Sequence, residues 1–343
     1  MILDMSNWYL QNGKDSDVVI SSRVRLARNL VEYNFPNKHL KDESKEVLNK
    51  LEEITPSLGY GLKFLKLDNM DDITKISLME KHLISPDFAM NNKPNKAIII
   101  NDDENICIMV NEEDHLRMQV FSAGLELENL VGLMTEIDDK LSELVNYAYN
   151  EKYGYLTACP TNVGTAMRIS IMVHLPALTL TGNIGKVLRA VNNFGMSIRG
   201  IYGEGTESKG DVYQIFNSQS LGLSEKEITK NVKTITDKII EQERLARKYL
   251  TKKPMELENK VYRSFGILTN ARILSSDECR GLISDVKLGT DLGIINELND
   301  QKVKKIELYT KPGNLQKIVG NELSGFERDI KRCEIIRQIL NEK

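Results

Sequence analysis

Alternation of apolar and polar residues with a period of two occurs in several short segments, and all of them lie before Pro254. This pattern is typical of half-buried β-strands, and it is clearest over residues 167–175. From Pro254 onward the periodicity is helical. The chain is therefore expected to fold as a mixed domain of strands and helices over residues 1–252, followed by an all-helical domain over residues 253–343.

The local patterns place individual elements within this plan. Two isoleucine-rich runs flank the polar residues 102–105, which predicts a β-hairpin. Ser224 and Glu227 form a capping box at the start of a long helix. Further strands are expected at residues 62–67, 115–120, 197–202 and 211–219, and further helices at residues 41–54, 71–83, 125–149, 183–194, 255–274, 277–287 and from residue 325 to the end.

The composition is that of an ordinary globular protein, with 41% hydrophobic and 28% charged residues. A formal net charge of -3 does not point to nucleic acid or to a membrane surface. No apolar run approaches the roughly 18 residues that a membrane span needs. The first ten residues contain Asp4 and lack a basic segment followed by an apolar run, so no signal peptide is expected.

Metal-binding and disulfide patterns are lacking in the sequence. The four cysteines are far apart and form no CxxC pair, and the four histidines show no HExxH spacing. Reduced thiols and a cytoplasmic location fit this usage best. The cysteines are Cys107, Cys159, Cys279 and Cys333.

Arginines recur beside the strand patterns. Ser21, Arg23 and Arg25 share one face at strand spacing, and a period of two is expected to place Glu113 and Arg117 on one face together with His115. Each motif alone is more typical of a solvated strand. Together, the five arginines suit a polyphosphate, because forked guanidinium groups bind phosphate oxygens without a Walker loop. They are Arg23, Arg25, Arg117, Arg168 and Arg199.

Two loops carry further chemistry. Cys159 precedes a turn containing Pro160 and Gly164, and Thr161 follows two residues later. This cysteine is either a buried, inert side chain or a thiolate stabilised by nearby arginine. Residues 203–210 form a glycine-rich connection that would carry Glu204 over a ligand, or else a plain solvated loop.

Four motifs in this order resemble the phosphagen (ATP:guanidino) kinase family, which includes creatine and arginine kinases. They are residues 21–25 (SSRVR), residues 111–117 (NEEDHLR), residues 159–165 (CPTNVGT) with Arg168, and Arg199–Gly200 with Gly203 and Glu204. The animal enzymes carry a helical domain of about a hundred residues before the first motif, whereas here that motif is nearly N-terminal and a helical segment follows the last one. This arrangement resembles the bacterial members that phosphorylate arginine side chains within proteins.

The resemblance implies an α+β catalytic domain with an antiparallel sheet flanked by helices, of the glutamine-synthetase-like type. It implies ATP with Mg²⁺ held through the nucleotide, Glu113 as the catalytic base, Glu204 as a second guanidinium ligand, and Cys159 as a thiolate. Thr161 would donate a hydrogen bond to that thiolate. The implied ATP-binding residues are Ser21, Ser22, Arg23, Val24, Arg25, His82, Arg117, Arg168, Ile169, Ser170, Ile171, Met172, Arg199, Gly200, Ile201, Tyr202 and Gly203.

The resemblance also implies a regulatory site for phosphoarginine in the helical domain, at Arg328, Asp329 and Arg332. Cys333 stands there in place of the family's alanine, and Ala166 stands where relatives usually have glycine. The family implies a homodimer, and as partners a zinc-binding activator protein, a stress-response repressor and an ATP-dependent protease. Phosphorylation would mark proteins for the stress response and for proteolysis.

Two other functions remain open on the sequence. A kinase for free arginine or another small guanidino compound would use the same residues. A regulator that binds phosphoarginine without turnover is the second alternative, although such a protein has no need of Glu113, Glu204 and Cys159 together. A DNA-reading regulator would require a basic helix that the chain lacks.

Overall fold

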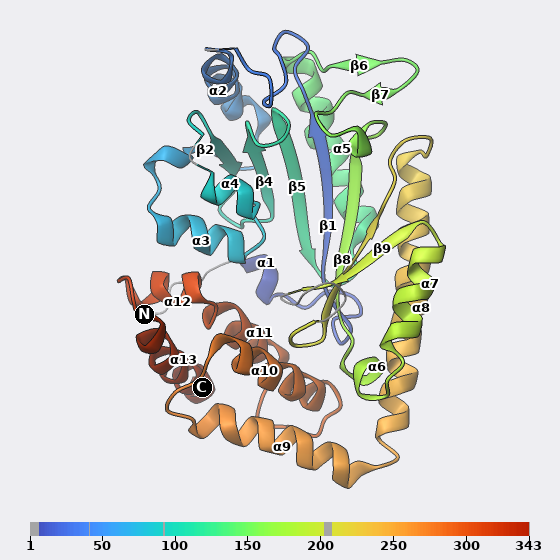
Figure 1. The fold of residues 1–343 in the computed structure, drawn as a ribbon, viewed down its shortest axis with the longest axis vertical. Coiled ribbons are helices and arrows are strands. Elements are labelled where there is room, and N and C mark those ends of the chain that lie inside the picture. The colour runs from blue at the N-terminus through green and yellow to red at the C-terminus, as the bar shows by residue number, and fades with distance from the viewer. Residues whose placement is uncertain (1–6, 41, 92, 202–207, 343) are drawn as a thin grey trace.

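The computed structural model describes residues 7–40, 42–91, 93–201 and 208–342. Within them an eight-stranded antiparallel sheet runs in the order β2-β3-β4-β5-β1-β8-β10-β9 (Figure 1), and a separate hairpin is formed by β6 and β7. The strands are β1 (Val19–Arg28), β2 (Lys63–Lys66), β3 (Ala97–Ile100), β4 (Ile106–Val110), β5 (Leu116–Ala123), β6 (Tyr149–Asn150), β7 (Gly154–Tyr155), β8 (Met167–His174), β9 (Met196–Gly200) and β10 (Val212–Asn217). The predicted antiparallel sheet and the hairpin of β3 and β4 are confirmed.

The two faces of the sheet differ because side chains alternate along each strand. Residues directly opposite each other share a face, and Arg23 pairs with Ser170 while Arg25 pairs with both Arg168 and Gln119. One face is therefore basic and polar, and we call it the arginine face. Val24 and its neighbours on the other face are completely buried.

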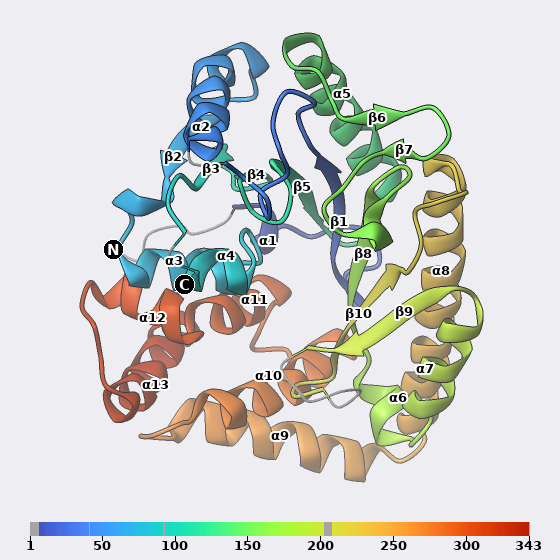
Figure 2. The ribbon, with the colours of Figure 1, turned by 45° about the horizontal axis from the view of Figure 1, so that its top comes forward.

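Two long helices, α5 (Leu127–Leu144) and α8 (Glu225–Leu250), cover the apolar face (Figures 1 and 2). Their apolar stripes join the sheet in one core, which includes Met134 of α5 and Ile235 of α8. The predicted capping box at Ser224 and Glu227 begins α8, because each side chain satisfies the other residue's backbone N–H.

The remaining helices lie around the sheet and below it (Figure 2). Those before Pro254 are α1 (Asn7–Leu10), α2 (Glu43–Ile54), α3 (Asp72–Glu80), α4 (Pro86–Met90), α6 (Pro176–Leu180) and α7 (Ile184–Asn193), with short 3₁₀ turns at Thr55–Leu58, Leu67–Asn69 and Pro160–Asn162. The helical C-terminal domain consists of α9 (Pro254–Asn270), α10 (Ser276–Asp291), α11 (Asp300–Tyr309), α12 (Pro312–Val319) and α13 (Gly325–Asn341).

Several sequence-based boundaries are wrong, and two of these differences have a clear structural reason. The helix expected to reach residue 149 ends at Leu144, because the next residues pair with the segment that follows β1: Val31 N donates to Asn146 O and Ala148 N donates to Asn29 O. Similarly, β5 begins only at Leu116, so Glu113, His115 and Arg117 do not share a strand face. His115 instead accepts a hydrogen bond from Leu30 N, 3.0 Å from its Nδ1.

Candidate active site

A cavity of about 560 Å³ lies between the arginine face and the segment that joins α3 to α4. This volume is in the range of small-molecule sites. The arginines Arg23, Arg25, Arg117 and Arg199 line it from the sheet, and His82 lines it from the α3–α4 segment. The other lining residues are Met79, Glu80, Ile84, Ser85, Pro86, Met109, Gln119, Met172, Gly200, Ile201 and Gln214.

The guanidinium groups are held in place by neighbours on the sheet. Gln214 Oε1 accepts hydrogen bonds from Arg199 Nε and Nη2, at 3.2 and 2.9 Å. The ring of Phe216 lies 5.5 Å from the guanidinium carbons of both Arg168 and Arg199, within cation–π range. These contacts aim the side chains before any ligand arrives, which lowers the entropy that binding would cost.

Positive charge accumulates in the cavity, where Arg23 and Arg25 are buried next to other arginines. Burial, and then the charges of Arg117, Arg199 and Arg168, lower the pKa of Arg23 to about 9. Burial also holds the pKa of Arg25 well below its usual value, with Arg23 as the next cause. A bound polyanion would relieve this repulsion.

Several buried polar atoms of the cavity and its extension beneath Trp8 lack a hydrogen-bond partner among the described residues. They include Arg25 Nε, His82 Nε2 and Ser170 Oγ. Buried polar groups are normally satisfied, so such atoms indicate a ligand site. Donors of this kind fit the phosphates and sugar of a nucleotide.

His82 occupies an unusual backbone position. Its φ is 63°, in the left-handed region that glycine prefers. The hydrogen bond from Leu83 N to Leu78 O ends α3 in the manner of a Schellman motif, with His82 where glycine is usual. Burial holds the pKa of His82 well below its usual value, so its imidazole is neutral at pH 7.

The two consecutive glutamates take different positions. Glu112 Oε1 lies 2.6 Å from Arg117 Nη1 and accepts a hydrogen bond from Ser85 Oγ at 2.6 Å. Burial alone would raise the pKa of Glu112, but Arg117 and Ser85 hold it below its usual value. Glu113 is exposed to solvent. Glu112 is thus a fixed support for Arg117, a role that we did not foresee from the sequence.

Cys159 lies at the start of the loop before β8, half-buried, with its Sγ 3.0 Å from Thr161 Oγ1. The predicted contact between this thiol and Thr161 is therefore present. Arg168 connects the loop to the arginine face: its Nη2 donates to Asn162 Oδ1 at 3.2 Å, and it pairs with Arg25 of β1. Burial and then Arg117 lower the pKa of Arg168, while the neighbouring Cys159 and Glu113 oppose that shift. The structure thus brings the cysteine, the exposed glutamate and the arginine face together.

Some predicted ATP-binding residues are not on the arginine face. The side chains of Val24, Ile169 and Ile171 point into the opposite core, since the strand period places them there. Ser22 is also buried on that side, where its hydroxyl donates to Gly124 O at 2.6 Å. The predicted site residues Tyr202, Gly203 and Glu204 lie outside the described residues.

The remaining predicted positions lie in or beside the cavity. Ser21 and Ser170 border its extension beneath Trp8, and Met172, Gly200 and Ile201 line the main volume. The sequence did not single out Gln214 or Phe216. Their spacing of two on β10 was visible, but only the pairing of β10 with β8 and β9 reveals that they face the arginines.

The predicted phosphoarginine-binding residues on α13 differ in how deeply they are buried. Arg332 is buried, and its guanidinium donates to the carbonyl oxygens of Thr310 (3.0 Å) and Leu274, and to Asp329 Oδ1 (2.7 Å). Arg328 is partly exposed and donates to Leu323 O at 2.8 Å. Cys333 is fully buried in the helical domain.

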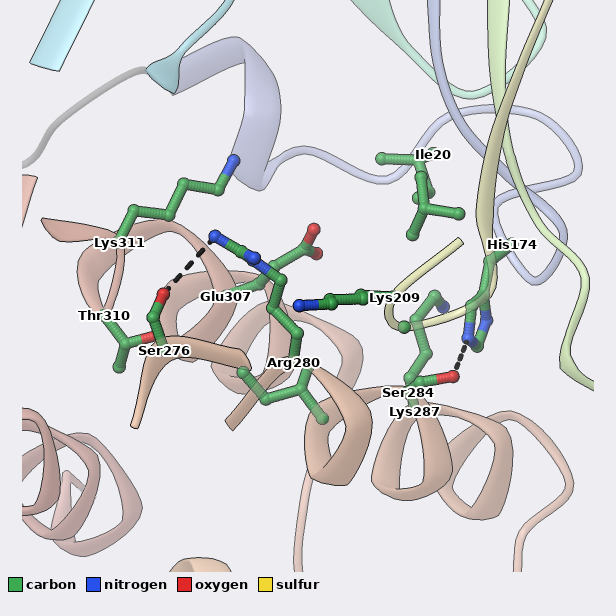
Figure 3. Close-up of a pocket in the computed structure, with 13 residues that line it drawn as sticks. Ile20, His174, Lys209, Ser276, Arg280, Ser284, Lys287, Glu307, Thr310 and Lys311 are labelled. Atoms are coloured by element: carbon green, nitrogen blue, oxygen red, sulfur yellow. Dashed lines mark hydrogen bonds between the residues drawn. The ribbon is translucent and has the colours of Figure 1, made fainter. Parts of the chain in front are cut away.

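A second, much smaller cavity of about 30 Å³ separates the sheet from α10 and α11 (Figure 3). There His174 Nε2 lies 2.9 Å from Ser284 Oγ, which in turn donates to Asp211 Oδ2 at 2.7 Å. The volume suffices for a few water molecules and not for a nucleotide. This cavity is therefore part of the packing between the sheet and the helical domain.

Two classes of site are not found in the described residues. They contain no group of three or more histidine, cysteine or acidic side chains arranged to hold a metal ion. No helix within residues 7–40, 42–91, 93–201 and 208–342 has the length and apolar character to cross a membrane.

Comparison with known proteins gives two family matches along the chain. Residues 41–246 match the family described as ATP:guanido phosphotransferase, C-terminal catalytic domain, and residues 254–343 match the protein-arginine kinase McsB C-terminal domain. A protein-arginine kinase of Halothermothrix orenii is 47% identical over 340 residues, covering 98% of this chain and 97% of that protein. A protein-arginine kinase of Clostridium acetobutylicum is 44% identical over 340 residues, covering 98% of this chain and all of that protein (100%).

Solved structures share the fold of the sheet domain. The duplicated taurocyamine kinase from Schistosoma mansoni with bound transition-state analogue components superimposes with a TM-score of 0.60 at 26% identity, over 68% of this chain and 34% of that chain. A lombricine kinase gives a TM-score of 0.59 at 24% identity, over 68% of each chain, and shows the fold alone. The predicted phosphagen kinase fold is thereby confirmed.

Proposed function

Because the chain belongs to the protein-arginine kinases of the ATP:guanido phosphotransferase family, we propose that its arginine-lined cavity holds the phosphates of ATP and that Glu113 and Cys159 receive an arginine side chain of a protein substrate. The observation that carries this assignment is the convergence of Arg23, Arg25, Arg117 and Arg199 on one cavity, with the exposed Glu113 and Cys159 beside Arg168.

The arginines would stabilise charge on the transferred phosphoryl group and align it with the attacking nitrogen. Those two effects dominate phosphoryl transfer. Mg²⁺ would be held through the phosphates of the nucleotide. The ion would supply positive charge that neutralises the phosphates.

The acceptor is a guanidinium group, which has no free lone pair while it is protonated. Glu113 would take a proton from the attacking nitrogen as the bond from nitrogen to the γ-phosphorus forms and the bond from that phosphorus to the ADP oxygen breaks. Cys159 as a thiolate, in contact with Thr161, would complement the charge of the substrate. Glu204 would hold a second guanidinium nitrogen.

The same proposal extends to the setting in which the kinase works. Residues 1–252 would carry catalysis in the cytoplasm, and residues 253–343 would form the homodimer and bind phosphoarginine. Arg328 and Asp329 would contact that ligand, while Arg332 would fix Asp329 through the 2.7 Å contact. A zinc-binding activator protein, a stress-response repressor and an ATP-dependent protease would be its partners, so that phosphorylation marks proteins for proteolysis.

The test is to incubate the protein with labelled Mg-ATP and a loosely folded protein, and separately with free arginine. Acid-labile, base-stable label on the protein is expected, because a phosphoramidate behaves in that way. Glu113→Gln is expected to abolish transfer, with a loss of about a hundredfold or more. Glu128→Gln, at an exposed residue of α5 that pairs with Lys233, is the matched control.

Other outcomes would change the assignment. Label on free arginine alone would make the protein a small-molecule guanidino kinase. Absence of transfer, with an activator present as well, would leave a binding role only.

A further inference from the structure

The N-terminus of α12, in the helical C-terminal domain, meets the C-terminus of α3, whose last residues line the cavity. The two carboxylate oxygens of Glu80, the last residue of α3, accept hydrogen bonds from Gly313 N and Asn314 N, each at 2.8 Å. These N–H groups are among the first of α12 and have no partner within their own helix. A carboxylate also interacts favourably with the positive end of the helix dipole.

The contact is close and leaves little freedom. A Cβ atom added to Gly313 would lie 2.6 Å from Ile76 Cγ2 and 2.9 Å from Ser77 N, so only glycine allows α12 to approach α3 this closely. Ser77 Oγ donates to Asn314 Oδ1 at 2.6 Å, and Lys311 Nζ donates to Glu80 O at 3.2 Å. The end of α3 is therefore fixed from the side of the helical domain.

That same end of α3 forms a wall of the cavity. Met79, Glu80 and His82 all line it, and His82 follows Glu80 by two residues. Between them, Lys81 is anchored on the other side by Glu104, 2.7 Å from its Nζ. Because His82 adopts a left-handed conformation set by the last turn of α3, a shift of that turn moves its imidazole relative to the arginines.

We propose that Glu80 is a positioning residue for the nucleotide: by binding the N-terminus of α12, it fixes the end of α3 and His82 against the arginine face. The helical domain then sets the affinity for ATP through this contact. This inference rests on the proposed use of the cavity for ATP.

The test compares Glu80→Gln with Glu327→Gln. Both changes remove a carboxylate that accepts a hydrogen bond from a backbone N–H at the start of a helix in the helical domain. Glu327 belongs to the capping box of α13 and does not line the cavity, so it serves as the control. The dissociation constant of a fluorescent ATP analogue and the KM for Mg-ATP are measured, with kcat at saturating ATP. For Glu80→Gln, the dissociation constant and the KM are each expected to rise about tenfold, which corresponds to the loss of one hydrogen bond to a charged group. The kcat is expected to change by less than about twofold. Glu327→Gln is expected to leave nucleotide affinity unchanged.

A second pair of variants tests the contact by a change in α12. Gly313→Ala introduces the close contact with Ile76, whereas a Cβ at Gly325, at the start of α13, meets only the end of Arg328 at 3.9 Å. Gly313→Ala is expected to weaken ATP binding as Glu80→Gln does, and Gly325→Ala is not. If Glu80→Gln fails to fold, Ser77→Ala removes one bond of the same contact and takes its place.

Unchanged ATP affinity in folded Glu80→Gln and Gly313→Ala would overturn the inference. Equal losses in Glu80→Gln and Glu327→Gln would do so too, because they would show a general effect of destabilisation. Nucleotide binding is measured without phosphoryl transfer, so a chain that binds ATP but does not phosphorylate arginine would refute the proposed function and leave this inference standing.

Discussion

His82 shows how a single residue combines backbone strain with a place in the site. A left-handed conformation costs a non-glycine residue about 1–2 kcal/mol, and the imidazole nitrogen Nε2 has no partner among the described residues. Strain of this kind persists where the side chain serves a function. Under the proposed function, this conformation of His82 lowers stability but places an imidazole nitrogen in the cavity, where it would bind ATP.

Replacing His82 should separate these two roles. His82→Gly is expected to keep the free energy of unfolding within about 1 kcal/mol of the parent while weakening ATP binding about tenfold. Urea unfolding and an equilibrium binding titration measure the two quantities. Asn95→Gly, at φ 61° but outside the cavity lining, is the control and should bind ATP normally. Equal ATP affinity in His82→Gly and the parent would contradict the role of His82.

The burial of His115 predicts that the free energy of unfolding depends on pH. It is fully buried, and its Nε2 lies 2.9 Å from His39 Nε2 and 3.0 Å from Asn34 O. Burial, and then the charge of His39, lower the pKa of His115 to about 4, from an ordinary value of 6.5. Between these values the unfolded chain binds a proton that the folded chain does not, so stability falls as the pH drops from about 6.5 towards 4.

The expected loss from His115 between pH 7 and pH 5 is about 2 kcal/mol. His115→Asn retains an acceptor for Leu30 N but cannot titrate in this range. Between pH 7 and pH 5, the free energy of unfolding of this variant should therefore fall by about 2 kcal/mol less than that of the parent. Urea unfolding of both proteins at the two pH values gives the comparison. The same fall in parent and variant would show that His115 is not the group responsible.

At the scale of elements, the loop that carries Cys159 depends on its backbone. Gly164 has a φ of 117°, and an added Cβ would lie 2.6 Å from Ser220 O and 2.8 Å from Leu221 Cα. Ala166, two residues later, has a φ of 52° without being glycine. Ala166 therefore adopts a conformation that favours glycine.

The two positions predict opposite effects of glycine and alanine. Gly164→Ala should destabilise the protein by about 3 kcal/mol and lower kcat, because the loop would move Cys159. Ala166→Gly should instead stabilise by about 1 kcal/mol and keep kcat. Thermal unfolding and initial rates test both. A stable, fully active Gly164→Ala protein would refute the claim that this close packing positions the cysteine.

The elements also show what could be predicted from sequence. The period of two in β1 correctly predicted that Arg23 and Arg25 share one face of their strand, because that periodicity is local. Only the pairing of β1 with β8 shows that Arg168 lies on the same face. It failed before β5, where a bend and not a strand carries Glu113. Likewise, no local signal revealed that β10 would bring Gln214 to Arg199, since strand order is set by packing across the whole sheet.

At the scale of the molecule, the change from mixed to helical patterns predicted a separate C-terminal unit, and that unit is helical. The buried core of this unit, however, also includes residues of the sheet. One cluster of buried residues joins Ile98, Met109 and Phe121 of the sheet with Val286 and Ile336 of the helical domain. The sequence could not show that the two parts share a core, because the contacting residues lie more than a hundred positions apart. Each of them has only the pattern of an ordinary apolar residue.

The shared core predicts that the two parts unfold together. Removing residues 253–343 would expose the apolar side chains of β3, β4 and β5 to water, and large exposed apolar patches lead to aggregation. The intact chain should therefore show one calorimetric transition with equal calorimetric and van't Hoff enthalpies. Residues 1–252 alone should aggregate, and co-expression with residues 253–343 as a second chain should restore a folded complex that binds ATP. A soluble fragment of residues 1–252 with the melting temperature and ATP affinity of the whole chain would show instead that the sheet domain is self-sufficient.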